Sequence, residues 1–207
     1  MKEAIVINSN GEKRISTRTM VQVAMLGAVA GVLMLLEFPL PFIAPTFYKL
    51  DFSEVPVMIG GFAMGPVAGI VIEGIKIAIH LILKGTSTAF VGELGSFIMG
   101  CALVVPAAVI YKKHRTRKRA LIGLIVGIVV AVAASVLVNA YMLLPAYGAA
   151  FGMDISVFIG MGTAINPAID SLVTFCLLAV APFNLFKGVV VAVITLLLYK
   201  HLRRIIK

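Results

Sequence analysis

Long apolar segments separated by short polar ones are the dominant pattern of the chain. Four of these segments cover residues 19–36, residues 92–111, residues 120–144 and a stretch that opens at Pro182. Each is close to the roughly 20 residues that an α-helix needs to cross the hydrocarbon core of a bilayer. The pattern therefore predicts a transmembrane helix in each of these four places.

A further apolar run, residues 54–83, is too long for one membrane helix and too short for two. Gly65-Pro66 offers a break, because glycine often follows the end of a helix and proline fits the first turn of the next one. We therefore expect a short helix at residues 54–64 and a longer one at residues 66–83, which brings the total to six.

Three prolines, Pro39, Pro41 and Pro45, follow the first helix. Proline lacks a backbone N–H and fixes φ, so residues 37–45 cannot continue a membrane helix. The segment is also too apolar for a solvated loop, and irregular backbone is tolerated at membrane depth only where it packs on protein or lines a cavity. We expect this first loop to fold back over the bundle as a lid.

The composition agrees with a membrane-embedded chain. Of the 207 residues, 61% are hydrophobic and 13% are charged, whereas soluble proteins average about 45–50% apolar and about 25% charged residues. This balance excludes a soluble enzyme, a disordered chain and a nucleic-acid-binding domain. We predict an all-α integral membrane protein, with six helices in a compact bundle at residues 19–207 after a polar tail at residues 1–18.

The net charge of +9 comes from basic residues that gather in three segments, residues 1–18, 112–119 and 200–207. Basic residues that flank membrane helices favour the cytoplasmic side, and an even number of helices brings all three segments to that side. The charge then needs no nucleic acid as a partner. Both termini are expected in the cytoplasm, with the basic segments near anionic lipid headgroups of the bilayer.

Ionisable side chains inside apolar segments are costly, so each is a candidate for function. Glu73, Lys76 and His80 recur at helical spacing and lie on one helix face. One interpretation is an internal Glu73–Lys76 pair that neutralises itself. The other is a proton relay in a small proton-coupled carrier.

A second set, Glu93, Asn139, Asn184 and Lys187, comes from the last three predicted helices. All four residues are expected toward the non-cytoplasmic ends of their helices, with Asn184 and Lys187 opening the sixth, so they should converge under the lid. Two amides, one cation and one anion suit a neutral ligand with a donor–acceptor edge. The alternative is capping of helix ends and snorkelling at the lipid interface.

Signals for enzymes and metal sites are missing from the sequence. It has no HExxH, GxSxG or P-loop motif and no Cys/His cluster. Cys101 and Cys176 lie far apart in apolar stretches, which is typical of free thiols. A membrane enzyme is therefore the least supported reading, and no metal or cofactor is expected.

Four blocks of the sequence resemble the riboflavin-specific substrate-binding subunits (S components) of energy-coupling factor (ECF) vitamin transporters. They are residues 42–56, Gly65-Pro66, Gly92-Glu93-Leu94 and Asn184-Leu185-Phe186-Lys187-Gly188. The resemblance covers essentially the whole chain after the tail. It implies uptake of riboflavin across the cell membrane of a prokaryote, and it leaves open whether FMN or FAD is also accepted.

The resemblance also implies which residues bind the ligand. Hydrogen bonds would come from Glu93, Asn139, Asn184 and Lys187, although Asn139 is placed by its position in the helix rather than by a local motif. The loop that closes over the ligand would include Leu40, Phe42, Ile43, Ala44, Pro45 and Thr46. The dione edge of an isoalloxazine ring alternates acceptors with an N–H donor, which amides and a lysine can match. Phe42, Phe47 and Tyr48 could supply apolar walls.

Partner subunits are indicated by a second feature of the first helix. Ala24 and Ala28, reinforced by Gly27 and Gly31, have the small-xxx-small spacing that lets helices approach closely in lipid. Packing inside the bundle would explain the pattern equally well. The resemblance implies instead that Ala24 and Ala28 meet a transmembrane coupling subunit, with ATP hydrolysis by two separate ATP-binding subunits.

Two alternatives to a riboflavin-specific subunit are also consistent with the sequence. An S component for another vitamin would keep the same architecture and change the ligand. A small proton-coupled carrier that uses Glu73, Lys76 and His80 would need no partner subunits.

Overall fold

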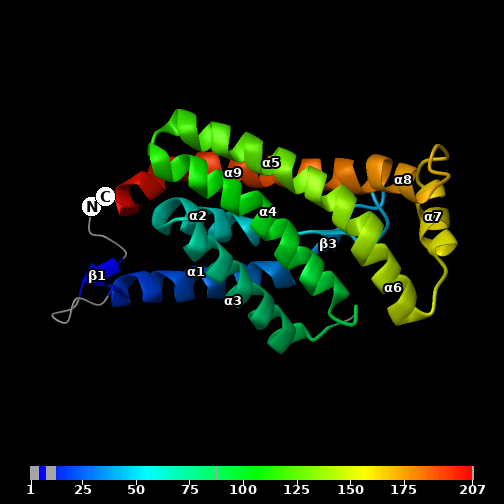
Figure 1. Cartoon of the computed structure of the whole chain (residues 1–207), viewed down its shortest axis with the longest axis horizontal. Helices are drawn as coiled ribbons and strands as arrows, with labels where there is room; N and C mark the ends of the chain where they lie inside the picture. The colour runs from blue at the N-terminus through cyan, green and yellow to red at the C-terminus, as the bar shows by residue number, and fades with distance from the viewer. Residues whose placement is uncertain (1–4, 8–12, 87, 207) are drawn as a thin grey trace.

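Helices that run side by side along the long axis form the protein (Figure 1). The computed structural model describes residues 5–7, 13–86 and 88–206. Within these residues, five helices are long and apolar enough to cross a membrane. They are α1 (Thr17–Leu35), α3 (Pro66–Lys84), α4 (Val91–Lys113), the helix Arg117–Phe151 that begins with α5 (Arg117–Val138), and the helix that begins at Leu172 and contains α9 (Ala181–Ile206).

The short helix predicted at residues 54–64 is present but does not have the length of a span. Helix α2 (Glu54–Met64) has 11 residues, about 16 Å at the usual rise per residue, which is half of the roughly 30 Å hydrocarbon core. The predicted short length of this helix is confirmed, and the prediction of six transmembrane helices is corrected to five candidate spans and one short apolar helix. Gly65 separates α2 from α3 as predicted, with φ at +103°, a conformation that glycine adopts without strain.

Two of the long helices extend further than predicted, and each contains a π-helical segment. Helix α5 continues through η1 (Asn139–Leu143) into α6 (Leu144–Phe151), and α8 (Leu172–Phe175) continues through η2 (Cys176–Val180) into α9. The last helical stretch thus starts at Leu172 and not at Pro182. Asn184 and Lys187 consequently lie well inside it, which corrects the expectation that they open a helix.

The proline-rich first loop is not helical, as predicted. Strand β3 (Phe38–Pro39) pairs antiparallel with β4 (Lys49–Leu50), and turns connect them. Near the start of the chain, β1 (Ile5–Ile7) pairs antiparallel with β2 (Lys13–Ile15). The expectation of a polar tail at residues 1–18 falls partly on residues 1–4 and 8–12, which lie outside the described residues. Helix α7 (Ile155–Thr163) connects the two long helices that contain π segments.

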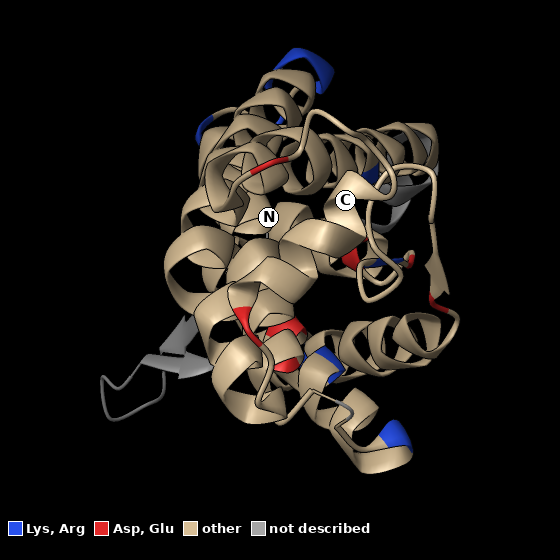
Figure 2. Ribbon diagram, turned by 90° about the vertical axis from the view of Figure 1, so that its right-hand side faces the viewer, with Lys and Arg blue, Asp and Glu red and all other residues tan. Residues whose placement is uncertain are grey.

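Two apolar clusters hold the bundle together. The first lies among α2, α4, α5 and α9 and includes Phe62 and Tyr111, whose ring centroids are 4.5 Å apart. The second lies where the lid meets the other end of the bundle, and it joins Ala44 to Phe158 and Phe175. Seen end-on in Figure 2, most of the ribbon carries neither acidic nor basic residues.

Close helix approach depends on glycine at several crossings. A Cβ added to Gly123 of α5 would lie 2.7 Å from the Ala107 carbonyl oxygen of α4, and one at Gly127 would overlap the Leu103 carbonyl oxygen. On α1, Gly27 and Gly31 are buried against Ile75 and Ile79 of α3. Small residues at such crossings let backbones approach in lipid, where packing replaces the hydrophobic effect.

Gly123→Ala should lower the free energy of unfolding by about 1–3 kcal/mol, because the new methyl group forces α5 away from the α4 backbone. Thermal unfolding of the detergent-purified variant measures this. Gly160→Ala in α7 is the matched control, since a Cβ there meets no heavy atom within 4 Å. The control should unfold at or above the wild-type temperature. Equal losses in both variants would contradict the close approach of α4 and α5.

Candidate ligand-binding site

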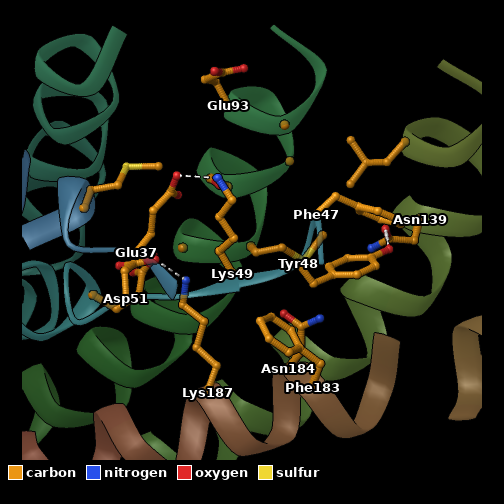
Figure 3. Close-up of a pocket in the computed structure, with 18 of the residues that line it drawn as sticks. Glu37, Phe47, Tyr48, Lys49, Asp51, Glu93, Asn139, Phe183, Asn184 and Lys187 are labelled. Carbon is orange, nitrogen blue, oxygen red and sulfur yellow. Dashed lines mark hydrogen bonds and ion pairs between the residues drawn. The ribbon is translucent and has the colours of Figure 1, made fainter. Parts of the chain in front are cut away.

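A cavity of about 170 Å³ lies between the lid and helices α3, α4 and α9. The four polar residues singled out in the sequence, Glu93, Asn139, Asn184 and Lys187, all line it. Their predicted convergence is therefore confirmed, although they come from three different helices (Figure 3). The other described lining residues are Met34, Glu37, Phe47, Tyr48, Lys49, Asp51, Glu54, His80, Thr88, Gly92, Gly95, Ser96, Met99, Gly100, Leu103, Ala131, Leu143, Tyr147, Phe183 and Gly188.

The two asparagines are held at the cavity wall by contacts with backbone carbonyls. The amide nitrogen of Asn139 donates to the Ser135 carbonyl oxygen at 2.8 Å, and that of Asn184 donates to the Val180 carbonyl oxygen at 2.9 Å. The Tyr48 hydroxyl donates to Oδ1 of Asn139 at 2.5 Å. Each amide group is thus fixed in orientation and keeps a second N–H for another acceptor.

Lys187 is held by a carboxylate that the sequence analysis did not select. Its Nζ donates to Oδ2 of Asp51 at 2.8 Å, and Oδ1 of Asp51 accepts the backbone N–H of Ser53, also at 2.8 Å. An ammonium group has three donors, so two remain for a ligand. Asp51 lies between β4 and α2, and its signal in the sequence was an acidic residue inside the apolar block Leu50–Pro56.

Glu93 lies apart from these amides and from Lys187, toward the opposite side of the cavity (Figure 3). Its Oε2 accepts hydrogen bonds from the Thr88 hydroxyl at 2.8 Å and the Thr86 hydroxyl at 3.2 Å. The carboxylate is largely buried. The cavity therefore presents donors from two helices on one side and an acceptor on the other.

Among the residues expected to contact the ligand from the lid and the segment after it, Phe47 and Tyr48 reach the cavity, as predicted. Their ring centroids are 4.6 Å apart, and Tyr48 lies 5.6 Å from the Phe183 ring. Leu40, Phe42, Ile43, Ala44, Pro45 and Thr46 are absent from the described lining. Phe42 is 72% exposed, while Ala44 is buried in the second apolar cluster. A ligand role for residues 40–46 stays a prediction, and it needs a movement of the lid.

An ion-paired carboxylate joins the lid to the ends of two helices. Glu37, just after α1, accepts from Lys49 of β4 at 2.7 Å and from Lys84 at the end of α3 at 2.5 Å. Partial burial acts to raise the pKa of Glu37, but the hydrogen bonds and charges of Lys49 and Lys84 together outweigh it and hold that pKa below its usual value. Glu37 therefore tethers the lid as an anion.

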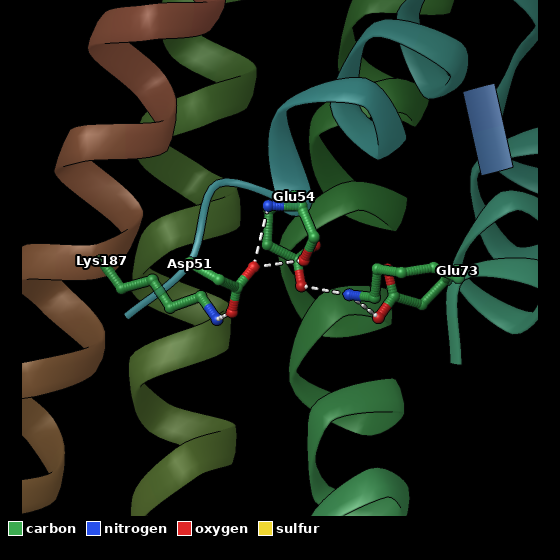
Figure 4. A network of polar contacts seen from close by, with 6 residues as sticks. Asp51, Glu54, Glu73 and Lys187 are labelled. Carbon is green, nitrogen blue, oxygen red and sulfur yellow. Dashed lines mark hydrogen bonds and ion pairs between the residues drawn. The ribbon is translucent and has the colours of Figure 1, made fainter. Parts of the chain in front are cut away.

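A buried charge network adjoins the cavity (Figure 4). Lys76 of α3 lies 2.5 Å from Oε1 of Glu73 and 2.8 Å from Oε1 of Glu54, and all three side chains are almost completely inaccessible. The predicted Glu73–Lys76 pair is confirmed, and Glu54 is a third member that the sequence analysis missed. A Cβ at Gly100 of α4 would overlap the Glu73 carboxylate, so glycine is required beside it.

The small residues of α1 separate into two faces. Gly27 and Gly31 are buried against α3, whereas Ala24 and Ala28 are exposed. Packing inside the bundle thus accounts for the glycines and leaves the alanines on the outer surface. Their predicted docking role is untested by this geometry.

Cys101 and Cys176 are free, as predicted. Among the described residues, no group of three or more His, Cys, Asp or Glu side chains is arranged to hold a metal ion.

Lys76→Met should lower the free energy of unfolding by about 3–5 kcal/mol, because it leaves the buried carboxylates of Glu54 and Glu73 facing each other without a cation. Thermal or denaturant unfolding in detergent measures the loss. Adding Glu54→Gln and Glu73→Gln to Lys76→Met should restore most of it.

The matched control is Lys84→Met, which breaks a more exposed ion pair with Glu37 and should cost about 1 kcal/mol or less. Equally small losses in the free energy of unfolding for Lys76→Met and Lys84→Met would show that the buried charge network does not stabilise the fold.

Comparison with known proteins shows which family and which solved structure the chain resembles. A family described as "ECF transporter, substrate-specific component" matches residues 18–199. The protein named riboflavin transporter RibU from Staphylococcus aureus is 31% identical over 202 residues, 96% of this chain and 98% of that protein. The protein named riboflavin transporter FmnP from Bacillus subtilis is 33% identical over 189 residues, 90% of this chain and 92% of that protein. A solved structure titled "Structure and mechanism of the S component of a bacterial ECF transporter" aligns with a TM-score of 0.71 at 31% identity, covering 92% of this chain and 98% of that one.

Proposed function

We propose that riboflavin is the ligand of this chain, which belongs to the family of ECF transporter substrate-specific components. A component of this family is a binding subunit of a multi-pass membrane transporter and not an enzyme. The observation that carries the proposal is the convergence of Asn139, Asn184 and Lys187 on one cavity that aromatic rings border. The relatives named above as riboflavin transporters support it.

The chemistry of the flavin ring matches the side chains of the cavity. Its dione edge offers two carbonyl acceptors around an N–H donor, and the remaining N–H groups of Asn139, Asn184 and Lys187 supply donors, while an amide oxygen can accept. Phe47, Tyr48 and Phe183 offer flat apolar surface to the rest of the ring. Leaving such an edge unpaired in a buried site costs about 1–3 kcal/mol per group, so the polar set would select the ligand.

The orientation of the protein in the membrane follows from its charges. The start of α1, the connection between α4 and α5, and the C-terminal part of α9 lie at the same end of the molecule (Figure 1). The three basic segments flank these points, so this end faces the cytoplasm. The cavity is lined from the opposite halves of α3, α4 and α9. It is therefore placed to capture riboflavin from outside.

Transport requires partners that supply energy. The family assignment implies an energising module, and the proposed module is a transmembrane coupling subunit with two ATP-binding subunits. The exposed face of α1 at Ala24 and Ala28 would meet the coupling subunit, because small side chains let a second helix approach closely in lipid.

Purified, ligand-stripped protein should quench riboflavin fluorescence on binding, with the flavin emission followed because the chain has no Trp. Asn184→Ala or Lys187→Ala should weaken binding roughly five- to 150-fold, since each leaves a buried group of the ligand unpaired. Lys113→Ala, at an exposed position at the end of α4, is the matched control and should bind like the wild type. Unchanged flavin emission at micromolar wild-type protein would exclude riboflavin as the ligand.

Ala28→Trp should leave riboflavin affinity unchanged and abolish ATP-dependent uptake in cells that contain the partner subunits, because an indole separates the two helices. Val129→Trp, on an exposed face of α5, is the control and should still transport. Normal uptake by Ala28→Trp would exclude docking at this face. Loss of both binding and uptake would show instead that Ala28 is needed for folding.

A further inference from the structure

A histidine on the α3 wall of the cavity has no assigned partner. His80 is 6% exposed and lines the cavity. Neither Nδ1 nor Nε2 has a hydrogen-bond partner among the residues that the structure describes. Buried polar groups are nearly always paired, so an unpaired imidazole at a cavity wall indicates a partner that enters with the ligand.

The charged groups around His80 are already engaged. Lys76, one turn earlier on α3, contacts Glu54 and Glu73. Lys84, one turn later, contacts Glu37. The two charged side chains nearest to His80 along α3 are therefore already ion-paired, and the imidazole takes part in neither set of contacts.

His80 also comes from a different helix than the groups proposed to hold the flavin ring. It comes from α3, and Met34 of α1 and Ser96 of α4 line the cavity as well. Asn139 belongs to η1, and Asn184 and Lys187 belong to α9. The helices of the α1–α3 side and Asn139 lie at opposite sides of the cavity in Figure 3. A ligand that extends from Asn139 across the cavity would therefore also reach the α3 side.

We propose that His80 binds the hydroxylated side chain of the flavin, while Asn139, Asn184 and Lys187 hold the edge of its ring. The assignment rests on riboflavin as the ligand. A hydroxyl group both donates and accepts, so it can pair with either nitrogen of a neutral imidazole, whichever carries the proton. Once the ring edge is assigned, the polyol chain is the remaining strongly polar part of riboflavin.

The test compares riboflavin with lumiflavin, which has the same ring and a methyl group in place of the polyol chain. His80→Phe keeps an aromatic ring of similar size and removes both nitrogens. It should weaken riboflavin binding at least tenfold in a fluorescence titration and change lumiflavin binding less than twofold. His80→Gln, which restores a donor and an acceptor, should recover much of the lost affinity. His114→Phe, at an exposed position after α4, is the matched control and should bind both flavins like the wild type.

Lumiflavin affinity also reports that the variant is folded, and His80→Leu is the second variant if His80→Phe does not purify. Equal losses for both flavins, or no loss for riboflavin, would overturn the assignment of His80 while wild-type riboflavin binding stands. A wild-type protein that binds neither flavin would overturn riboflavin as the ligand, and the assignment of His80 with it.

Discussion

Helix α2 begins inside the protein, and two carboxylates at its N-terminus each form an ion pair with a lysine of another helix. Helix α2 starts at Glu54, whose carboxylate contacts Lys76 of α3. Asp51, just before it, contacts Lys187 of α9. Negative charge at a helix N-terminus also interacts favourably with the helix dipole. Removal of either lysine leaves a buried anion, so the position of α2 between α3 and α9 depends on both contacts.

The same constraint shapes the cavity. Because α2 is short, the chain between the lid and α2 passes close to the bundle interior, and it brings Tyr48, Asp51 and Glu54 to the cavity wall. Tyr48 contacts Asn139 and Asp51 contacts Lys187, so the segment between the lid and α2 is tied to both helices whose polar groups face the cavity. Ligand binding and the position of this segment are thereby linked. A ligand that hydrogen-bonds to Asn139 or Lys187 would act on the same side chains that Tyr48 and Asp51 contact.

Sequence reasoning located the helices and the polar set but not the contacts between segments. Hydropathy places α1, α3 and α4 to within a few residues, because length and apolar content are local properties, and Gly65-Pro66 marks the break between α2 and α3. Asp51 and Glu54 were missed because their partners, Lys187 and Lys76, are remote in the sequence. The early start of the last helix was missed because Pro182 is typical of a first turn. The burial of Ala44 and the exposure of Phe42 depend on how the lid packs, which hydropathy does not specify.

The two π-helical segments make the orientation of the cavity residues depend on the number of residues in the helix at these two points. Each is followed two residues later by proline, Pro145 after η1 and Pro182 after η2, and a widened turn accommodates a ring that would clash in a regular α-helix. Asn139 begins η1, and Asn184 and Lys187 follow η2. Since each residue of an α-helix turns the chain by about 100°, deleting one residue within η2 would rotate Asn184 and Lys187 together relative to Cys176 and Phe175. A relative that lacks one residue between Ser171 and Asn184 would therefore line its cavity with a different face of this helix, although the hydropathy of the helix would be unchanged.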